Sequence, residues 1–191
     1  MANELQGRTV ALLIAPAGTE EPEFAEPKRA LEAAGATVHV VSTRTGDVQA
    51  VNGDLEPGGT YTVDKTFAEV SADGYDALII PGGTVGADKL RGDEGAVAFI
   101  RGFFEQAKPV GAICHAPWTL IEAGVVGGRT LTSYPTLQTD LRNAGATWRD
   151  AEVVTDQGLV TSRNPDDLPA FCAKLVEEIA EGNHQAQARS V

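Results

Sequence analysis

A cysteine followed directly by a histidine is the pair of side chains in this sequence best suited to chemistry. Cys114 and His115 come immediately after the apolar run PVGAI at 109–113, which is typical of a buried strand. A cysteine on a tight strand-to-helix turn is pushed out of the sheet, and the helix N-terminus favours its thiolate. We therefore predict a nucleophilic Cys114 with a lowered pKa. His115 is a candidate general base or acid, although neighbouring side chains on a turn often diverge.

The other cysteine and the other histidines are weaker candidates. Cys172 lies in the middle of a predicted helix beside Phe171, so it is interpreted as a packing residue and not as a disulfide partner. His39 falls inside a predicted strand, and His184 falls in the polar C-terminal segment. These positions leave Cys114 as the one thiol expected to react.

Two further segments, EEPE at 20–23 and PGG at 81–83, also fall where predicted strands end. Ligands of open α/β sheets bind at the carboxyl ends of the strands. One of the glutamates, if it points toward Cys114, would be buried and would stay protonated as a hydrogen-bond donor. The alternative is an acidic helix N-terminus with no catalytic role. The amides of Gly82 and Gly83 are candidate oxyanion-hole donors, although turns need glycine for other reasons.

Apolar strands alternate with amphipathic helices along the chain, which predicts a mostly parallel sheet with helices on both faces. The predicted strands cover 9–15, 37–42, 75–80, 109–113 and 130–132, and the predicted helices cover 22–34, 94–106, 116–123, 136–144 and 165–180. Hairpins are predicted around Asn52-Gly53 and over 152–162, and Pro27 predicts a bend or a restart of the first helix. We expect a single domain over 1–191, with a disordered polar tail from about residue 182.

The composition limits the classes of function. The net charge of -12 over 191 residues argues against binding to nucleic acid or to an anionic membrane. The apolar runs are too short to cross a bilayer, and the polar N-terminus predicts a cytoplasmic protein. Neither a phosphate-binding glycine motif nor metal-ligand spacing occurs, so no cofactor and no metal are predicted.

Several stretches together resemble the PfpI family of the class I glutamine amidotransferase-like superfamily. They are EEPEF at 20–24, ALIIPGG at 77–83, KPVGAICHAPWTLIEAGVVGGRTLTSYP at 108–135 and EVVTDQGLVTSRNPDDLPAF at 152–171. The resemblance covers about residues 8 to 180. It implies a flavodoxin-like three-layer sandwich with a small β-hairpin, and it implies Cys114 as the nucleophile on the strand-to-helix turn.

The resemblance also implies roles for two carboxylates. It points to Glu20 as the acidic residue that contacts the thiol. Family members form dimers or hexamers, and in some a carboxylate from a neighbouring subunit orients the histidine; Asp88 is the matching position here. The sequence departs from the family pattern by one extra residue between PGG and Asp88, and by Ala116 where glycine is common.

The leading functional hypothesis is a stress-protective cysteine enzyme that acts on reactive carbonyls, either methylglyoxal or glycated protein. Cys114 would attack the carbonyl carbon, Glu20 would carry a proton, and the amides of Gly82, Gly83 and His115 would hold the oxyanion. One alternative is an intracellular cysteine peptidase completed by Asp88 at a subunit interface. Another is a redox sensor or chaperone with an oxidisable Cys114. The expected partners are a small carbonyl compound or a protein or peptide substrate, and further copies of the chain.

Overall fold

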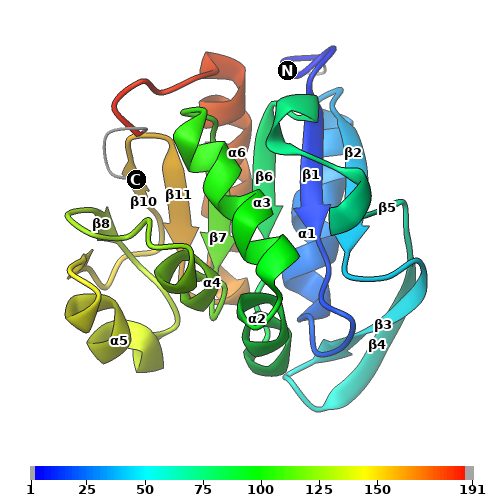
Figure 1. The fold of residues 1–191 in the computed structure, drawn as a ribbon, viewed down its shortest axis with the longest axis horizontal. Helices are drawn as coiled ribbons and strands as arrows, with labels where there is room; N and C mark the ends of the chain where they lie inside the picture. Colours follow the sequence, from blue (N-terminus) through cyan, green and yellow to red (C-terminus); the bar gives the residue numbers. More distant parts are fainter. Residues whose placement is uncertain (1–2, 188–191) are drawn as a thin grey trace.

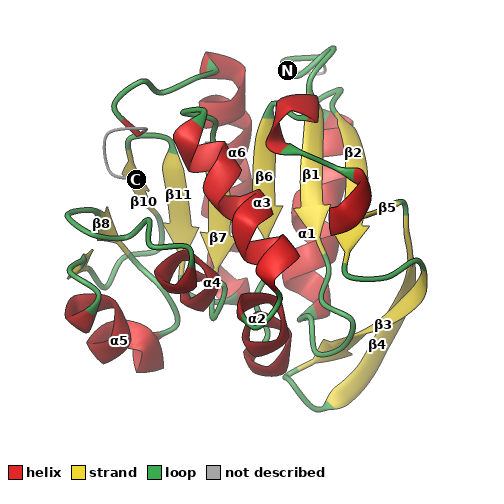
Figure 2. Cartoon of the chain, viewed as in Figure 1, coloured by secondary structure: helices red, strands yellow, loops and turns green. Residues whose placement is uncertain are grey.

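A seven-stranded sheet forms the centre of the molecule in this computed structural model, which describes residues 3–187. The strand order is β10-β11-β7-β6-β1-β2-β5, and only β10 runs antiparallel to its neighbour (Figures 1 and 2). The strands are β1 (Thr9–Leu13), β2 (Thr37–Ser42), β5 (Lys65–Thr66), β6 (Ala77–Ile80), β7 (Val110–Ile113), β10 (Val154–Asp156) and β11 (Leu159–Ser162). The strands β6 and β7 are buried along their whole length, as expected where helices cover both faces.

Helices cover both faces of this sheet. Helices α1 (Glu21–Ala33) and α6 (Leu168–Glu181) pack side by side on one face, and their core includes Phe24 and Phe171. The other face carries α2 (Thr84–Arg91), α3 (Glu94–Glu105) and α4 (Pro117–Glu122) over a second core rich in phenylalanine (Figure 1). The predicted three-layer sandwich is therefore confirmed.

Smaller elements surround the sandwich. The hairpin of β3 (Gly46–Asn52) and β4 (Glu56–Val63) forms its own two-stranded sheet, and β8 (Thr130–Leu131) pairs in parallel with β9 (Thr147–Trp148) beside α5 (Gln138–Asn143). Short 3-10 turns occupy Phe67–Glu69, Ala72–Gly74, Pro135–Leu137 and Pro165–Asp167. The carboxylate of Glu21 accepts hydrogen bonds from Asn52 Nδ2, the Gly59 amide and the Tyr61 hydroxyl, each at 2.8 Å. These bonds tie the β3–β4 hairpin to the start of α1.

The structure differs from the sequence prediction at two helices. Helix α1 continues through Pro27 and does not restart there. Helix α2 was not predicted, because the segment TVGADKLR offers few apolar residues in helical spacing. Tertiary contacts stabilise it instead: Asp54 Oδ1 accepts the Thr84 amide at 2.7 Å, and Gly86 lies so close to Gly18 that a Cβ would come within 2.6 Å of the Gly18 oxygen.

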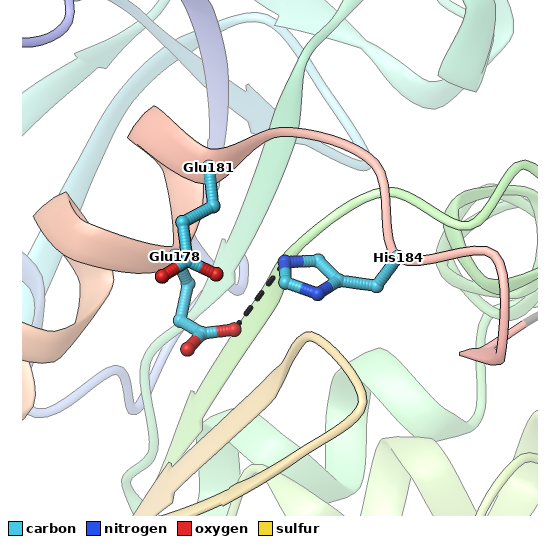
Figure 3. Close-up of side chains that lie close together, drawn as sticks. All are labelled: Glu178, Glu181 and His184. Atoms are coloured by element: carbon cyan, nitrogen blue, oxygen red, sulfur yellow. Dashed lines mark ion pairs between the residues drawn. The ribbon is translucent and has the colours of Figure 1, made fainter.

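The segment after α6 was expected to be disordered, but its described residues, 182–187, are ordered. The His184 amide donates to the Ala107 oxygen at 2.7 Å, and the buried Arg129 guanidinium donates to the Gln187 oxygen at 2.9 Å. His184 Nε2 lies 3.3 Å from Glu178 Oε2 (Figure 3). Polar composition predicted disorder, but specific hydrogen bonds hold residues 183–187 against the body; residues 188–191 lie outside the described part. No helix within residues 3–187 has the length and apolar character needed to span a membrane.

Candidate active site

Cys114 lies on a strained turn between β7 and α4. Its φ of 63° is in the left-handed region, where a residue other than glycine costs about 1–3 kcal/mol. Two backbone hydrogen bonds hold it there: the Cys114 amide donates to the Ser162 oxygen at 3.0 Å, and the Tyr134 amide donates to the Cys114 oxygen at 2.8 Å. The turn aims the side chain away from the sheet, toward the carboxyl ends of the strands.

The glutamate that contacts the thiol is Glu23 and not Glu20. The Glu23 carboxyl group is completely buried, hydrogen-bonds the Cys114 side chain, and accepts the Gly82 amide at 2.8 Å. Glu20 accepts the amides of Gly53 and Asp54 at 2.8 and 3.0 Å, so its carboxylate is committed to the β3–β4 hairpin. The reason is the position on the helix: Glu20 is the extended N-cap of α1, whereas Glu23 lies in the first turn and faces the sheet.

Burial controls the charge of both acidic groups at the turn. It raises the pKa of Glu23 to about 8, helped by the negative charges of Glu20 and Asp54. Burial also raises the pKa of the Cys114 thiol, and the adjacent Glu23 acts in the same direction. This direction is opposite to the lowered thiol pKa predicted from the helix N-terminus. Near neutral pH Glu23 carries a proton that it can donate, and Cys114 needs a base to become a nucleophile.

His115 is the imidazole that lies beside the thiol. Its Nδ1 lies 3.2 Å from Cys114 Sγ, so the two neighbouring side chains do not diverge. The imidazole is stacked on Tyr134, with ring centroids 4.7 Å apart and planes 25° from parallel. Burial lowers the pKa of His115, which keeps the ring neutral and able to accept a proton.

The backbone amides around the sulfur divide into two kinds. The Gly82 amide is occupied by Glu23, so its predicted place in an oxyanion hole is wrong. The amides of Gly83 and His115 do hydrogen-bond the Cys114 sulfur, and both lower its pKa against the effect of burial. These two amides can therefore donate hydrogen bonds to a negatively charged sulfur, or to a negatively charged atom bonded to the sulfur-linked carbon.

Asp88 does not reach the site within the chain. It lies on the exposed side of α2, its carboxylate is 62% exposed, and it pairs with Arg91 at 2.9 Å. His115 Nε2 instead lies 3.4 Å from Thr84 Oγ1, and Thr84 is hydrogen-bonded to Asp54. The contribution of Asp88 from a neighbouring copy, and the assembly that it requires, stay predictions.

A cavity of about 420 Å³ opens over the sulfur, a size suited to a small molecule or a side chain. The residues lining it are Glu20, Glu23, Gly53, Asp54, Gly83, Thr84, Cys114, His115, Tyr134, Thr136 and Pro165. Sequence reasoning did not find Asp54, Thr84 and Tyr134, because no motif marks them. The position of Thr84 directly after the PGG turn was the one available signal.

Gly82 leaves no room for a side chain, which gives a stability prediction. A Cβ there would lie 2.6 Å from Glu23 Oε2, 2.7 Å from Cys114 Cβ and 2.8 Å from the Ile113 oxygen. We expect Gly82→Ala to lower the free energy of unfolding by about 1–3 kcal/mol, measured by urea denaturation. Gly74→Ala is the control, because a Cβ at Gly74 meets nothing within 4 Å. Equal stability of the two variants would contradict the packing described here.

One group of side chains outside the cavity has the types that bind metals. Among the described residues, Glu178, Glu181 and His184 place their ligand atoms within 4.8 Å of one another (Figure 3). Glu181 is exposed, and buried Glu178 has half-buried His184 as its partner. The group therefore holds the C-terminal segment on α6 without requiring an ion.

Relatives of known name match most of the chain. A deglycase of Thermococcus kodakarensis is 41% identical over 166 residues, which are 87% of this chain and 96% of the relative. The protein/nucleic acid deglycase 2 of Escherichia coli is 44% identical over 154 residues, covering 80% and 87% of the two chains. A Bacillus subtilis protein named provisionally as a cysteine protease is 42% identical over 152 residues, with the same coverage.

Solved structures agree with the fold. The chain superimposes on DJ-1beta of Drosophila melanogaster with a TM-score of 0.81 and 30% identity, covering 95% of this chain and 94% of the other. A two-domain protein from Anabaena variabilis, with DJ-1/ThiJ/PfpI-like and ferritin-like domains, gives a TM-score of 0.84 at 34% identity, covering 90% of this chain and 48% of that one. The model of the DJ-1/PfpI family matches residues 8–178. With this match and these relatives, the chain belongs to the DJ-1/PfpI family.

Proposed function

We propose that this protein is a cysteine-dependent enzyme that converts reactive carbonyl compounds, methylglyoxal or its early adducts on protein amines, into lactate. The observation that carries the proposal is the position of the Cys114 sulfur between a neutral imidazole at 3.2 Å and the buried Glu23 carboxyl group. This arrangement supplies a nucleophile, a base and a proton donor within one small cavity. The deglycase names of two relatives support the same substrate class.

The first step forms a carbon–sulfur bond. The Cys114 proton passes to His115 Nδ1 as the sulfur attacks the aldehyde carbon of methylglyoxal. The carbonyl oxygen gains negative charge and takes a proton from Glu23, whose raised pKa keeps it protonated near neutral pH. The amides of Gly83 and His115, which act on the Cys114 sulfur in the resting site, would stabilise the developing charge. The product of this step is a hemithioacetal on Cys114.

The second step moves hydrogen and releases the product. Glu23, now ionised, removes the proton from the carbon bonded to sulfur, while protonated His115 gives its proton to the ketone oxygen, and an enediol forms. Glu23 then returns its proton to the neighbouring carbon, and the hydroxyl group on the sulfur-bonded carbon gives its proton back to His115. This leaves a lactoyl thioester on Cys114, which water cleaves to lactate and the free thiol. The net reaction adds one water to methylglyoxal. A carbinolamine adduct on a protein must first lose its amine: Glu23 gives a proton to the nitrogen and takes one from the hydroxyl group as the carbon–nitrogen bond breaks. The free amine leaves, and the aldehyde that remains enters the same steps to lactate.

Peptide hydrolysis is the second candidate, favoured by the 3.2 Å contact between Cys114 and His115 and by the protease name of one relative. An amide needs an acid that protonates the leaving nitrogen, and protonated His115 would supply it. The exposed, Arg91-paired Asp88 does not support the histidine within the chain. For that reason the carbonyl reaction fits the described site better.

The test is turnover of methylglyoxal without added thiol. The purified, reduced protein is incubated with methylglyoxal, and lactate is followed by proton NMR; casein and a fluorogenic peptide amide are assayed in parallel. We expect many lactate molecules per Cys114 and no amide cleavage. Absence of lactate from a protein with a titratable thiol would overturn the proposal. Amide cleavage would then support the peptidase, and ready oxidation of Cys114 by peroxide would support the redox sensor.

A further inference from the structure

We infer that Asp54 and Thr84 fix the position of the proton on His115 and so make its Nδ1 the base for Cys114. Asp54 Oδ1 accepts the Thr84 amide at 2.7 Å, and Asp54 Oδ2 accepts the Thr84 hydroxyl at 2.8 Å. The same hydroxyl oxygen lies 3.4 Å from His115 Nε2. A chain of polar contacts therefore runs from the β3–β4 hairpin to the sulfur.

The order of donors and acceptors along this chain follows from counting protons. A carboxylate can only accept, so the single proton of the Thr84 hydroxyl points to Asp54. The hydroxyl oxygen then faces His115 Nε2 as an acceptor, which favours the tautomer with the proton on Nε2. The unprotonated Nδ1 of that tautomer lies 3.2 Å from Cys114 Sγ. The thiol proton can therefore move to Nδ1, and the resulting imidazolium keeps its Nε2 proton directed to Thr84.

Asp54 is rigidly placed for this role. It lies at the tip of the hairpin with φ of 64°, and its amide and the Gly53 amide both donate to the Glu20 carboxylate. Glu20 thus acts on the site at a distance, by holding the loop that carries Asp54. Glu20 and Asp54 are positioning residues, because neither contacts the sulfur.

The surroundings of His115 contain few competing charges. The titratable groups in or around its pocket are Cys114, Asp54, Glu23 and Glu20, and on the other side the ring packs on Tyr134 and Trp118. Arg91 lies over the ring of Trp118, with its guanidinium carbon 4.8 Å from the ring centroid. Asp54 is the acidic group that reaches the Nε2 side of His115, through Thr84. The protein therefore has, within one copy, an acidic group that orients His115, which is the role that the Asp88 hypothesis assigns to a second copy.

This inference rests on the proposed role of Cys114 as nucleophile, and its test does not use methylglyoxal. In a Cys172→Ser background, the rate of Cys114 alkylation by iodoacetamide is measured from pH 5 to 10 for the parent, Thr84→Val, Thr84→Ser and Asp54→Asn. Nitrogen-15 NMR of the labelled histidines reports the tautomer of His115. Thr62→Val is the matched control, since Thr62 is a hairpin threonine whose hydroxyl bonds Asp47 outside the cavity.

We expect the parent to carry the His115 proton on Nε2, and Thr84→Val to move it to Nδ1. The alkylation rate of Thr84→Val at pH 7 should fall about tenfold or more, since a hydrogen bond to a charged group is worth that factor. Its rate should then climb with pH as the thiol ionises by itself, at a pH above that of an ordinary thiol because burial and Glu23 raise its pKa. Thr84→Ser should restore most of the rate. Asp54→Asn should resemble Thr84→Val, because the new amide donates to the hydroxyl and turns the hydroxyl proton toward Nε2.

The inference is overturned if Thr84→Val and Thr62→Val give the same tautomer and the same pH profile as the parent. It is also overturned if Thr84→Ser and Thr84→Val lose the rate equally, because the effect would then be one of packing. Lactate formation by the parent is scored separately. If no lactate forms, the tautomer and alkylation measurements still test the role of Asp54 and Thr84. If those measurements overturn that role, the lactate assay still tests the proposed carbonyl chemistry.

Discussion

Cys114→Ser is expected to lower the rate of lactate formation from methylglyoxal by about a thousandfold or more, while the protein stays folded. Serine preserves the shape of the side chain, but its hydroxyl is a far weaker acid and a far weaker nucleophile than a thiol. The buried surroundings of the sulfur increase this difference, because a serine alkoxide would have to form where a charge is poorly solvated.

The measurement is the initial rate of lactate formation, with circular dichroism and thermal unfolding as tests of folding. Cys172→Ser is the matched control, since Cys172 is half-buried on α6 and does not line the cavity. We expect that control to keep the parental rate. A rate for Cys114→Ser within tenfold of the parent would remove the nucleophile from the mechanism and the proposed function with it.

Glu23→Gln is expected to make the protein more stable at pH 8 but much less active. The folded-state pKa of Glu23 is about 8, against an ordinary value of 4.5. Since the folded state binds this proton more tightly, the contribution of Glu23 to stability is complete below pH 4.5 and is lost as the pH rises to about 8. The loss is on the order of 4 kcal/mol. Glutamine carries no charge to desolvate, so the variant avoids the loss.

Urea denaturation at pH 5 and pH 8 checks the thermodynamic half of this prediction. The advantage of Glu23→Gln over the parent should be small at pH 5 and several kcal/mol at pH 8. Glu26→Gln is the control, because Glu26 is an exposed glutamate on the same helix that pairs with Arg29. An advantage of the same size at both pH values would show that Glu23 does not titrate as described.

Lactate formation checks the catalytic half. Glutamine can still accept the Gly82 amide and donate to the sulfur, but it cannot release and regain a proton. We expect the rate to fall by about a hundredfold to ten-thousandfold, the usual contribution of a positioned acid–base group. A parental rate in Glu23→Gln would mean that another group carries the proton between the two carbons.

Glu20 and Glu23 illustrate where sequence reasoning about the site succeeded and where it stopped. The glutamate-rich start of the first helix was correctly placed at the edge of the sheet where the thiol emerges. Which glutamate faces the sulfur depends on the entry of the chain into the helix: the N-cap residue is extended and points to the hairpin, and the residue three positions later points to the sheet. The family resemblance favoured Glu20, and the packing of α1 decided for Glu23.

Apart from α2, the sequence by itself determined the succession of the main strands and helices along the chain, the sheet covered by helices on both faces and the position of Cys114 at a strand end, because hydrophobic periodicity and turn residues are local signals. Only the tertiary structure decided the pKa values of the site's acidic groups and which polar side chains contact His115. The raised pKa values of Cys114 and Glu23 come from burial, which is a property of the whole fold. The contact of Asp54, Thr84 and His115 joins residues about 30 positions apart. No local pattern encodes such a contact, since it exists only once the hairpin, α2 and the turn after β7 have packed together.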